Sequence, residues 1–341
     1  MNDKTIFVLS NKPVTIERLH LCSWDFAESK GLFEIGVEFY APQGVNEVVF
    51  KIALPFGKGT ATPFCLKDSL IRDDDNCKFI FNDSISAIKP IKGDKRNGAI
   101  VEFASRGKLA VLPVSDVENT SSVLSIKVKA LQQNQIANYI RLCLEVDVDK
   151  FAVTKKGIAK KSYIYDIKVN ELRNLTDEVN DLRNNGYVLC SNIKHCFCFH
   201  VLPSDYNISY LNTAKLKNIR MLEADAFNKY LPLSRAINDN EYLIVFNKDS
   251  KNDKSGYTFF SEFEKETIGS KQIVSAVALN ILCSLLFAFS SLDCKKEGSW
   301  FAQVPIGYWI AIVCLVVFGL IIVWPKSWSR SKLVKGRMVK R

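Results

Sequence analysis

Two neighbouring stretches decide the fold class: LFEIGVEFY at Leu32–Tyr40 and EVVFKIAL at Glu47–Leu54. In both stretches apolar side chains alternate with polar ones, which is the two-residue period of a strand with one buried face. The segment APQG at 41–44 separates them, so we expect a hairpin or a short loop there. These stretches therefore predict two consecutive β-strands.

The same alternation recurs along the chain as far as residue 170. Further strands are predicted at Cys77–Phe81, Ala99–Phe103, Lys108–Val114, Val123–Ala130, Tyr139–Val148 and Tyr163–Val169. Turn clusters such as GDKRNG at 93–98 lie between these strands, and helical stretches do not. Many short strands broken by turns predict a mainly β domain over residues 1–170, built as an antiparallel sandwich or barrel.

The pattern becomes mixed after residue 170. Apolar residues there recur at helical spacing, at Leu172, Leu175, Val179 and Leu182. Strands return at Lys194–Leu202 and Glu241–Asn247. We therefore expect a smaller α+β segment over residues 171–271, with a boundary near residue 170.

Two apolar runs without a charged residue follow, Ile273–Leu292 and Val304–Trp324. A helix of about 20 residues is about 30 Å long, which matches the hydrocarbon core of a bilayer. The runs therefore predict a two-helix transmembrane hairpin over residues 272–325, followed by a basic tail at 326–341. The lipid bilayer is the expected partner of the hairpin.

The net charge of +10 belongs mostly to the tail, which has seven Lys and Arg and no acidic residue. Residues 1–271 carry 37 Lys and Arg against 34 Asp and Glu, a net charge of only +3, so we expect no DNA or RNA partner. Basic residues flank the hairpin, and the apolar core of the N-terminus, Ile6–Leu9, is too short for a secretory signal. We expect an inner-membrane protein with both termini in the cytoplasm.

Two groups of basic residues in predicted turns are candidates for binding phosphate groups of a ligand. They are Lys89, Lys92, Lys95 and Arg96, and Lys155, Lys156, Lys160 and Lys161. Solvated turns at the surface have the same composition, so this alternative stays open for both groups.

The segment HCFCFH at 195–200 resembles a set of metal ligands. On a strand, Cys196, Cys198 and His200 would share one face. Alternate positions of one strand converge poorly on a single ion, so we expect a buried strand and no metal or cofactor. Phosphate-loop, G-x-S-x-G, H-E-x-x-H and dinucleotide motifs are absent from the sequence, and we expect no enzymatic activity.

The first apolar run contains a stripe of small and polar residues at four-residue spacing: Ala276, Asn280, Ser284 and Ala288. Small residues allow helices to pack closely, and an amide within a membrane requires a hydrogen-bonding partner. The stripe predicts either packing within the hairpin or contact between copies in a homo-oligomer, where it could line a pore.

This architecture resembles the two-span β-domain membrane effectors of bacterial anti-phage signalling, which respond to cyclic oligonucleotides. The resemblance lies in the order of the domains alone. It implies that the cytosolic domain senses a ligand, such as a nucleotide second messenger, and controls membrane-disrupting assembly of the hairpins. The alternative is a membrane-tethered scaffold that recruits a protein partner.

Overall fold

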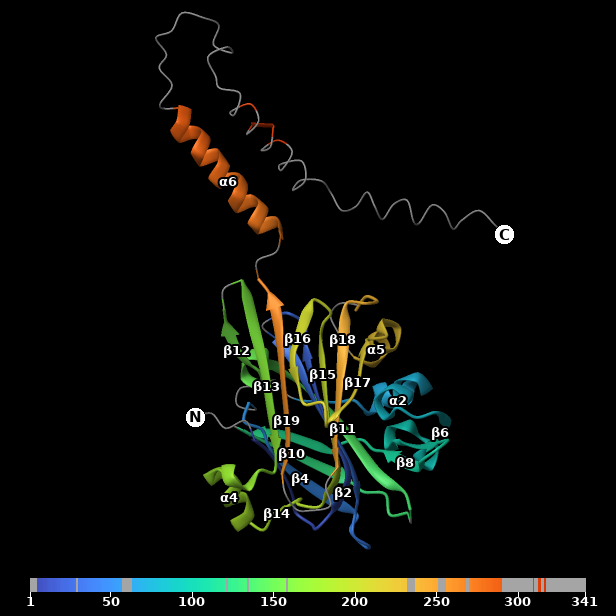
Figure 1. The fold of residues 1–341 in the computed structure, drawn as a ribbon. Helices are drawn as coiled ribbons and strands as arrows, with labels where there is room; N and C mark the ends of the chain where they lie inside the picture. Colours follow the sequence, from blue (N-terminus) through green and yellow to red (C-terminus); the bar gives the residue numbers. More distant parts are fainter. Residues whose placement is uncertain are drawn as a thin grey trace, which may run out of the picture. The chain divides into compact units, whose positions relative to one another are not determined.

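The structure is a computed structural model that describes residues 5–28, 30–56, 63–120, 122–133, 135–157, 159–231, 237–250, 256–267 and 270–289, and the single positions 309, 312, 313 and 316. The chain divides into two compact units, one of 1–157 with 161–265 and one of 158–160 with 266–341. The first unit consists mainly of two mixed β-sheets with few helices (Figure 1), so the predicted mainly β class is confirmed.

Sheet 1 brings together strands from both ends of this unit. Its order is β16 (Tyr206–Leu211), β19 (Tyr257–Glu266), β13 (Lys160–Val169), β1 (Thr5–Ser10), β4 (Glu47–Ala53), β10 (Val123–Lys129) and β9 (Asp116–Thr120). Two short strands join it at the side, β12 (Val153–Lys156) next to β13 and β14 (Val188–Leu189) next to β1.

Sheet 2 carries the pocket described below. Its order is β17 (Leu216–Met221), β18 (Tyr242–Ser250), β15 (Ile193–Pro203), β2 (Thr15–Asp25), β3 (Lys30–Tyr40), β11 (Ala137–Asp147), β8 (Gly107–Val111), β7 (Ala99–Phe103) and β6 (Ile85–Pro90). The two-residue strand β5 (Phe64–Cys65) also pairs with β11.

The main hydrophobic core lies between the two sheets. Side chains of β1, β4, β10 and β13 in sheet 1 are buried there against side chains of β2, β3, β11 and β15 in sheet 2. Phe33, Ile35, Val37 and Phe39 all point into this core, because alternate residues of a strand share one face. These apolar side chains of Leu32–Tyr40 therefore pack between the two sheets.

Helices cover the outer faces of both sheets. Helices α1 (Lys67–Arg72), α2 (Asp74–Phe81) and α5 (Ala224–Tyr230) belong to a second apolar cluster on the outer face of sheet 2, and α4 (Asp177–Asn184) packs on sheet 1. The remaining short helices are α3 (Val148–Phe151), η1 (Ile91–Gly93), η2 (Lys95–Asn97) and η3 (Leu172–Asn174).

The prediction of purely antiparallel sheets is wrong. Strand β1 runs parallel to β13, β15 runs parallel to β2, and β11 runs parallel to β8. Parallel neighbours need a long crossover connection, and these pairs are formed by strands that are far apart in the sequence. The segment 41–44 is a short loop and not a hairpin turn, since β3 pairs with β2 and β11, whereas β4 pairs with β1 and β10.

The predicted strand at Cys77–Phe81 is instead part of helix α2. The carboxylate of Asp73 accepts a hydrogen bond from the backbone N–H of Asp75 and caps the helix. Asp74 and Asp75 lie in the first turn, where negative charge is favourable, and Asn82 ends the helix in the left-handed conformation. The apolar run was too short for its periodicity to distinguish helix from strand.

Contacts cross the boundary that we expect near residue 170. Strand β15 pairs with β2 in sheet 2, and β14 pairs with β1 in sheet 1, so segments on both sides of residue 170 share both sheets. The predicted helix at 172–182 occurs as η3 and α4, and Thr176 caps α4 through its hydroxyl group.

The first apolar run forms helix α6 (Ser270–Phe289). The second run lies outside the described residues, except for helical positions at Trp309, Ile312, Val313 and Val316. Within the described part of the chain, no helix combines the length and apolar character that a membrane crossing requires. The basic tail at 326–341 also lies outside the described residues.

Candidate functional site

Strand β15 separates two sets of side chains onto opposite faces. Cys196, Cys198 and His200 are buried, as the alternation predicts, whereas Phe197 and Phe199 lie on the other face and line a pocket. The imidazole Nδ1 of His200 lies 2.8 Å from the Ser23 hydroxyl, and burial lowers the pKa of His200 to about 3. Among the described residues no group of three or more His, Cys, Asp or Glu side chains is arranged to hold a metal ion.

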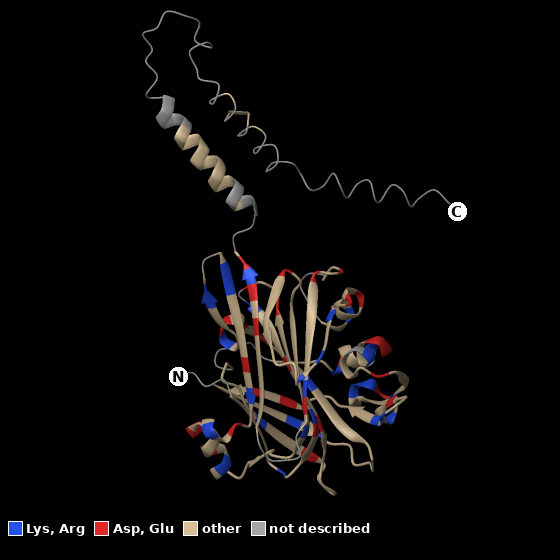
Figure 2. Ribbon diagram, in the orientation of Figure 1, with Lys and Arg blue, Asp and Glu red and all other residues tan. Residues whose placement is uncertain are grey.

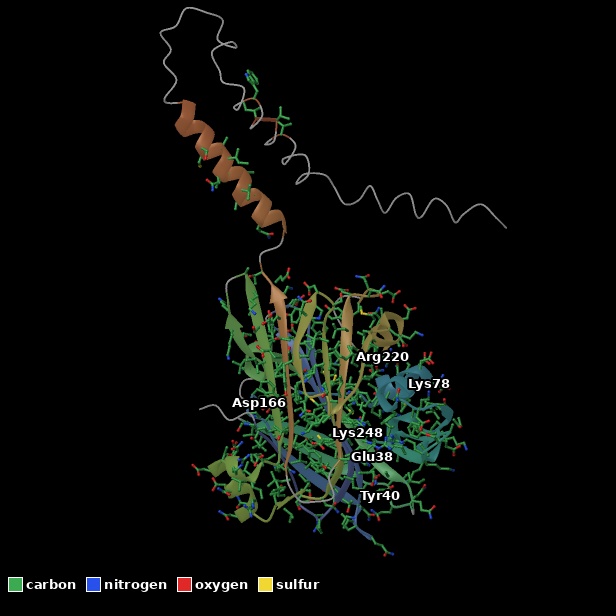
Figure 3. The ribbon with its side chains drawn as sticks, in the orientation of Figure 1. Glu38, Tyr40, Lys78, Asp166, Arg220 and Lys248 are labelled. Carbon is green, nitrogen blue, oxygen red and sulfur yellow. The ribbon has the colours of Figure 1, made fainter. Side chains whose placement is uncertain are left out.

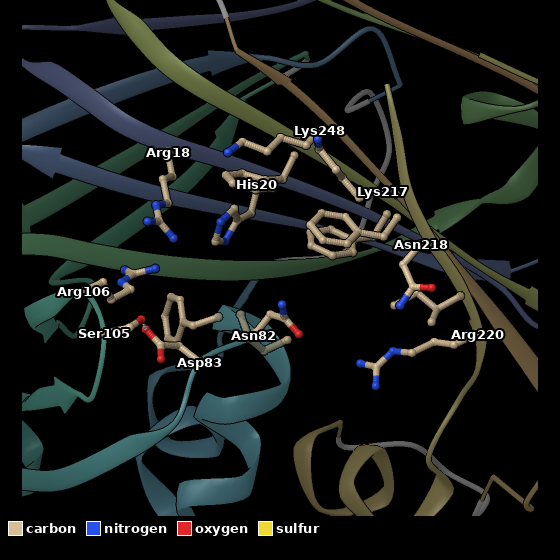
Figure 4. Close-up of a pocket in the computed structure, with 16 residues that line it drawn as sticks. Arg18, His20, Asn82, Asp83, Ser105, Arg106, Lys217, Asn218, Arg220 and Lys248 are labelled. Atoms are coloured by element: carbon tan, nitrogen blue, oxygen red, sulfur yellow. Dashed lines mark hydrogen bonds between the residues drawn. The ribbon is translucent and has the colours of Figure 1, made fainter. Parts of the chain in front are cut away.

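The pocket lies on the outer face of sheet 2 and has a volume of about 530 Å³. Its walls come from β2, β15, β17 and β18, from the end of α2 and from the turn between β7 and β8 (Figure 4). Five basic side chains and one acidic side chain line it: Arg18, Arg106, Lys217, Arg220, Lys248 and Asp83. The lining is therefore strongly basic, although residues 1–271 as a whole are nearly neutral.

Three phenylalanine rings form a stacked series along the pocket. The ring of Phe246 stacks on Phe199 at a centroid distance of 4.6 Å and an interplanar angle of 7°, and on Phe197 at 5.8 Å and 22°. Phe246 is a direct cross-strand neighbour of Phe199, which explains the parallel rings. His20 meets the edge of Phe197 at 5.0 Å. The result is a series of three stacked rings in the wall of a basic pocket.

The basic side chains lie at opposite ends of the pocket. Figure 4 shows Arg18 and Arg106 at one end and Lys217, Asn218 and Arg220 at the other. Lys248 lies above the Phe197 ring, with its ammonium nitrogen 5.4 Å from the ring centroid. A ligand in the pocket could therefore meet cations at both ends.

Glu38 on β3 forms ion pairs with both Arg18 and Arg106. Its carboxylate accepts a 2.8 Å hydrogen bond from Arg106 Nη2 and lies 3.7 Å from Arg18 Nε. Two guanidinium groups share this carboxylate, and Figure 4 shows Asp83 at the same end of the pocket. Figure 3 shows where Glu38, Arg220 and Lys248 lie on their strands.

The hydrogen bonding of these two arginines is incomplete within the described part of the chain. Arg18 Nε and Arg106 Nη1 are buried atoms without a hydrogen-bond partner among the described residues. Burial lowers the pKa of Lys248, and repulsion from Arg18 and Lys217 lowers it further. Buried donors without partners are unfavourable, so an anion placed here would gain hydrogen bonds and relieve the repulsion.

A buried polar network continues from the floor of the pocket. His20 Nδ1 lies 3.0 Å from the Tyr139 hydroxyl, which accepts a 3.0 Å hydrogen bond from Arg141 Nη1. Arg141 Nε donates to Glu34, which also accepts hydrogen bonds from Trp24 and from Tyr230 on α5. Burial lowers the pKa of His20, with smaller contributions from Arg141, Arg18 and Arg106, so its imidazole is neutral at physiological pH.

The eight basic residues that the sequence singled out lie elsewhere, since none lines the pocket. Lys89 on β6 pairs with Glu102, and Arg96 in η2 pairs with Asp94. Lys92 and Lys95 belong to η1 and η2, and the Lys67 ammonium donates to the Lys95 carbonyl oxygen. The other four residues form one hairpin of β12 and β13, where Lys156 is the cross-strand neighbour of Lys161: Lys155, Lys156, Lys160 and Lys161.

The stripe of the first apolar run lies on α6. The Ser284 hydroxyl donates a 2.9 Å hydrogen bond to the Asn280 carbonyl oxygen one turn earlier. Ala276 also lies on this helix, and the side chain of Ala288 lies outside the described residues. The Ser284 hydroxyl hydrogen is therefore already used within the helix, whereas the Asn280 amide keeps its capacity for a partner.

The sequence contains one signal that could have identified the pocket. Phe197 and Phe199 alternate with Cys196, Cys198 and His200 on β15, so they share the opposite face of the strand. Phe246 and Lys248 likewise lie two positions apart on β18. Arg18, Arg106 and Arg220 could not be assigned to one site, because they are brought together only by strand pairing across the whole chain.

Comparison with known proteins adds no assignment. No protein-family model matches the chain, and neither does any curated protein. Among solved structures, the chain is similar to Capitella teleta AChBP in complex with lobeline, at 6% identity over 78% of this chain and 87% of that chain. The TM-score of 0.11 is too low for this likeness to carry an argument about fold or function.

Proposed function

We propose that this protein is a membrane effector whose β-rich domain binds an anionic, aromatic ligand, of which a cyclic nucleotide second messenger is the best example. Binding would control membrane-disrupting assembly of a two-helix hairpin at 272–325, and anti-phage defence is the setting in which this architecture is expected. The observation that carries the proposal is the pocket, in which five cations surround a stacked series of three phenylalanines.

The chemistry of a nucleotide fits this pocket. A base has two flat faces that stack on aromatic rings, and stacking contributes about 1–3 kcal/mol per base. A phosphate accepts paired hydrogen bonds from guanidinium groups, and Arg18 Nε and Arg106 Nη1 have buried hydrogen atoms to donate. A ligand with two phosphates could use both basic ends of the pocket.

The membrane part of the proposal rests on the two uncharged apolar runs, Ile273–Leu292 and Val304–Trp324, and on the basic tail. The stripe on α6 gives the hairpins a surface on which copies could assemble. Both termini would be in the cytoplasm, so that the pocket is exposed to a cytoplasmic messenger.

Binding measurements with the full-length protein test the ligand assignment. We expect cyclic dinucleotides to bind, and Arg106→Gln to weaken binding about 10- to 100-fold, because a hydrogen bond to a charged group contributes about 1.5–3 kcal/mol. Lys89→Gln, which removes a basic residue outside the pocket, should leave affinity unchanged. Equal loss in both variants, or no binding of any nucleotide, would contradict the proposal.

A second candidate function is a membrane-tethered scaffold that binds a protein partner. Edge strand β16 supports it, since Ile208 and Tyr210 are 41% and 51% exposed and the Tyr210 ring contacts the exposed Phe260 ring of β19. Exposed aromatic residues are typical of protein interfaces. A scaffold should leave the membrane potential of expressing cells unchanged when the nucleotide is supplied, whereas an effector should abolish it.

A further inference from the structure

The β12–β13 hairpin places four lysines at one surface loop. Lys155, Lys156 and Lys160 are exposed, and Lys161 lies over the Tyr163 ring at 4.7 Å. Figure 2 shows these basic segments of β12 and β13. Within the described residues, Lys155 and Lys156 make no ion pair, unlike Lys89 and Arg96 in the other basic group.

The tip of this hairpin is bonded to the segment that leads into α6. The backbone N–H of Thr267 donates a 2.8 Å hydrogen bond to the carbonyl oxygen of Ala159, which is the residue before Lys160. Helix α6 begins at Ser270, three residues later. Three residues span at most about 10 Å, whatever direction the helix takes.

We infer that the β12–β13 hairpin is a docking surface for anionic lipid headgroups. This inference rests on the proposed function, because it requires that α6 enters a bilayer. If it does, the bilayer surface lies within about 10 Å of the hairpin tip, close to the Debye length of about 8 Å at physiological ionic strength. Lysines at that distance are attracted to anionic lipids.

The charges near the hairpin favour an anion. Two carboxylates contact the hairpin among the described residues: Asp149 accepts a 3.2 Å hydrogen bond from the Thr154 hydroxyl of β12, and Glu264 on β19 lies 3.4 Å from the Ser162 hydroxyl. The four lysines outnumber these two carboxylates. The exposed Val153 at the start of β12 adds an apolar side chain that can rest at the headgroup boundary.

The docked hairpin would fix the β-rich domain against the membrane at a second point besides the chain connection. A chain connection by itself restricts distance, whereas a second contact also restricts orientation.

The test uses the full-length protein in lipid nanodiscs that contain a photoactivatable phosphatidylglycerol. We expect crosslinks to the segment 153–164 in discs with phosphatidylglycerol, and about tenfold fewer in the variant Lys155→Gln/Lys156→Gln/Lys160→Gln/Lys161→Gln. The matched control, Lys89→Gln/Lys92→Gln/Lys95→Gln/Arg96→Gln, removes the same charge elsewhere and should keep the crosslinks. Circular dichroism should show that both variants retain β-structure.

Three results would overturn the inference, and they are distinguishable. Protein recovered outside the discs would contradict the membrane proposal and this inference with it. Inserted protein without crosslinks to the hairpin would contradict this inference alone. Crosslinks that disappear on addition of inorganic phosphate at constant ionic strength would show that the hairpin binds free anions and not lipid.

Discussion

Glu34 and Arg141 form an ion pair that is almost fully buried, with side chains 0% and 2% exposed. Removing one partner leaves a buried charge without its counter-charge, which costs about 3–5 kcal/mol. We therefore expect Glu34→Gln to lower the free energy of unfolding by this amount, measured by urea denaturation in detergent. Glu145→Gln breaks an exposed pair with Lys30 and should cost less than about 1 kcal/mol.

The double variant Glu34→Met/Arg141→Met separates burial of charge from packing. It removes both charges together, so we expect it to regain most of the stability that Glu34→Gln loses. A double variant as unstable as the single one would show that the hydrogen bonds to Trp24 and Tyr230, and not the counter-charge, are what Glu34 provides.

His200 makes stability depend on pH. Its folded-state pKa is about 3 because the ring is buried, whereas an unfolded histidine takes up a proton near pH 6.5. Between these values the unfolded state binds more protons, so stability falls as pH is lowered, by about 1.4 kcal/mol per pH unit. His200→Gln should remove this slope from the free energy of unfolding measured between pH 4 and 6.

Other buried groups also contribute to the pH dependence of stability. The pKa values of Asp25 and Glu38 are raised by burial, so their folded forms hold protons more tightly and their contribution has the opposite sign. Both groups remain in wild-type protein and variant, so the difference between the two isolates His200. An unchanged slope would mean that the ring is accessible to protons in the folded state.

At the scale of elements, strand β3 shows which structural features the alternation of apolar and polar residues predicts and which it does not. The sequence predicts the strand and its apolar face, and both are observed. It also suggests that Glu34 and Glu38 face solvent, yet they are 0% and 5% exposed. Two of their partners, Arg141 and Arg106, come from segments far from β3 in the sequence. The third, Arg18, is the cross-strand neighbour of Glu38 on β2, a strand that the alternation did not predict. The pocket could not be predicted for the same reason.

In helix α2, the alternation of apolar and polar residues predicts the wrong type of element. CKFIF satisfies a strand pattern over five residues, but the three aspartates before it act as a cap and a charged first turn. Capping residues were therefore more informative here than hydrophobicity. The helix matters for the site, because Phe81 and Asn82 at its end form one wall of the pocket.

The stripe on α6 gives a prediction for this helix. Asn280→Leu should weaken self-association and any membrane activity, because interhelical polar contacts contribute about 0.6 kcal/mol and each subunit of an assembly loses one. Ser284→Leu should have a smaller effect, since its hydroxyl hydrogen is bonded within the helix. Ile281→Leu is the control. Crosslinked oligomers and membrane potential are the measurements, and unchanged values for Asn280→Leu would indicate packing within one hairpin.

At the scale of the whole molecule, the expected topology can be tested with single-cysteine variants and an impermeant thiol reagent. Cys294 lies between the two apolar runs and should be labelled in intact cells. Cys22 is a poor cytoplasmic marker because it is 4% exposed and would resist labelling on either side of the membrane. A cysteine introduced as Lys156→Cys is exposed and should be labelled only after lysis. The reverse result would contradict the topology.

The parallel pairing of β15 with β2 has a consequence for biosynthesis. Strand β2 ends at Asp25, and its partner β15 begins at Ile193, so at about 5–20 residues per second β2 waits roughly 10–30 seconds for it. Sheet 2 is completed by β18, and sheet 1 by β19, whose last residue is only a few positions before the first apolar run. If the first apolar run enters a membrane as we propose, the nascent chain must close its sheets and reach the membrane within the same few seconds, with unpaired strand edges exposed until then. Holding chaperones on the ribosome, rather than spontaneous folding of the N-terminal half, should determine how much active protein a cell obtains.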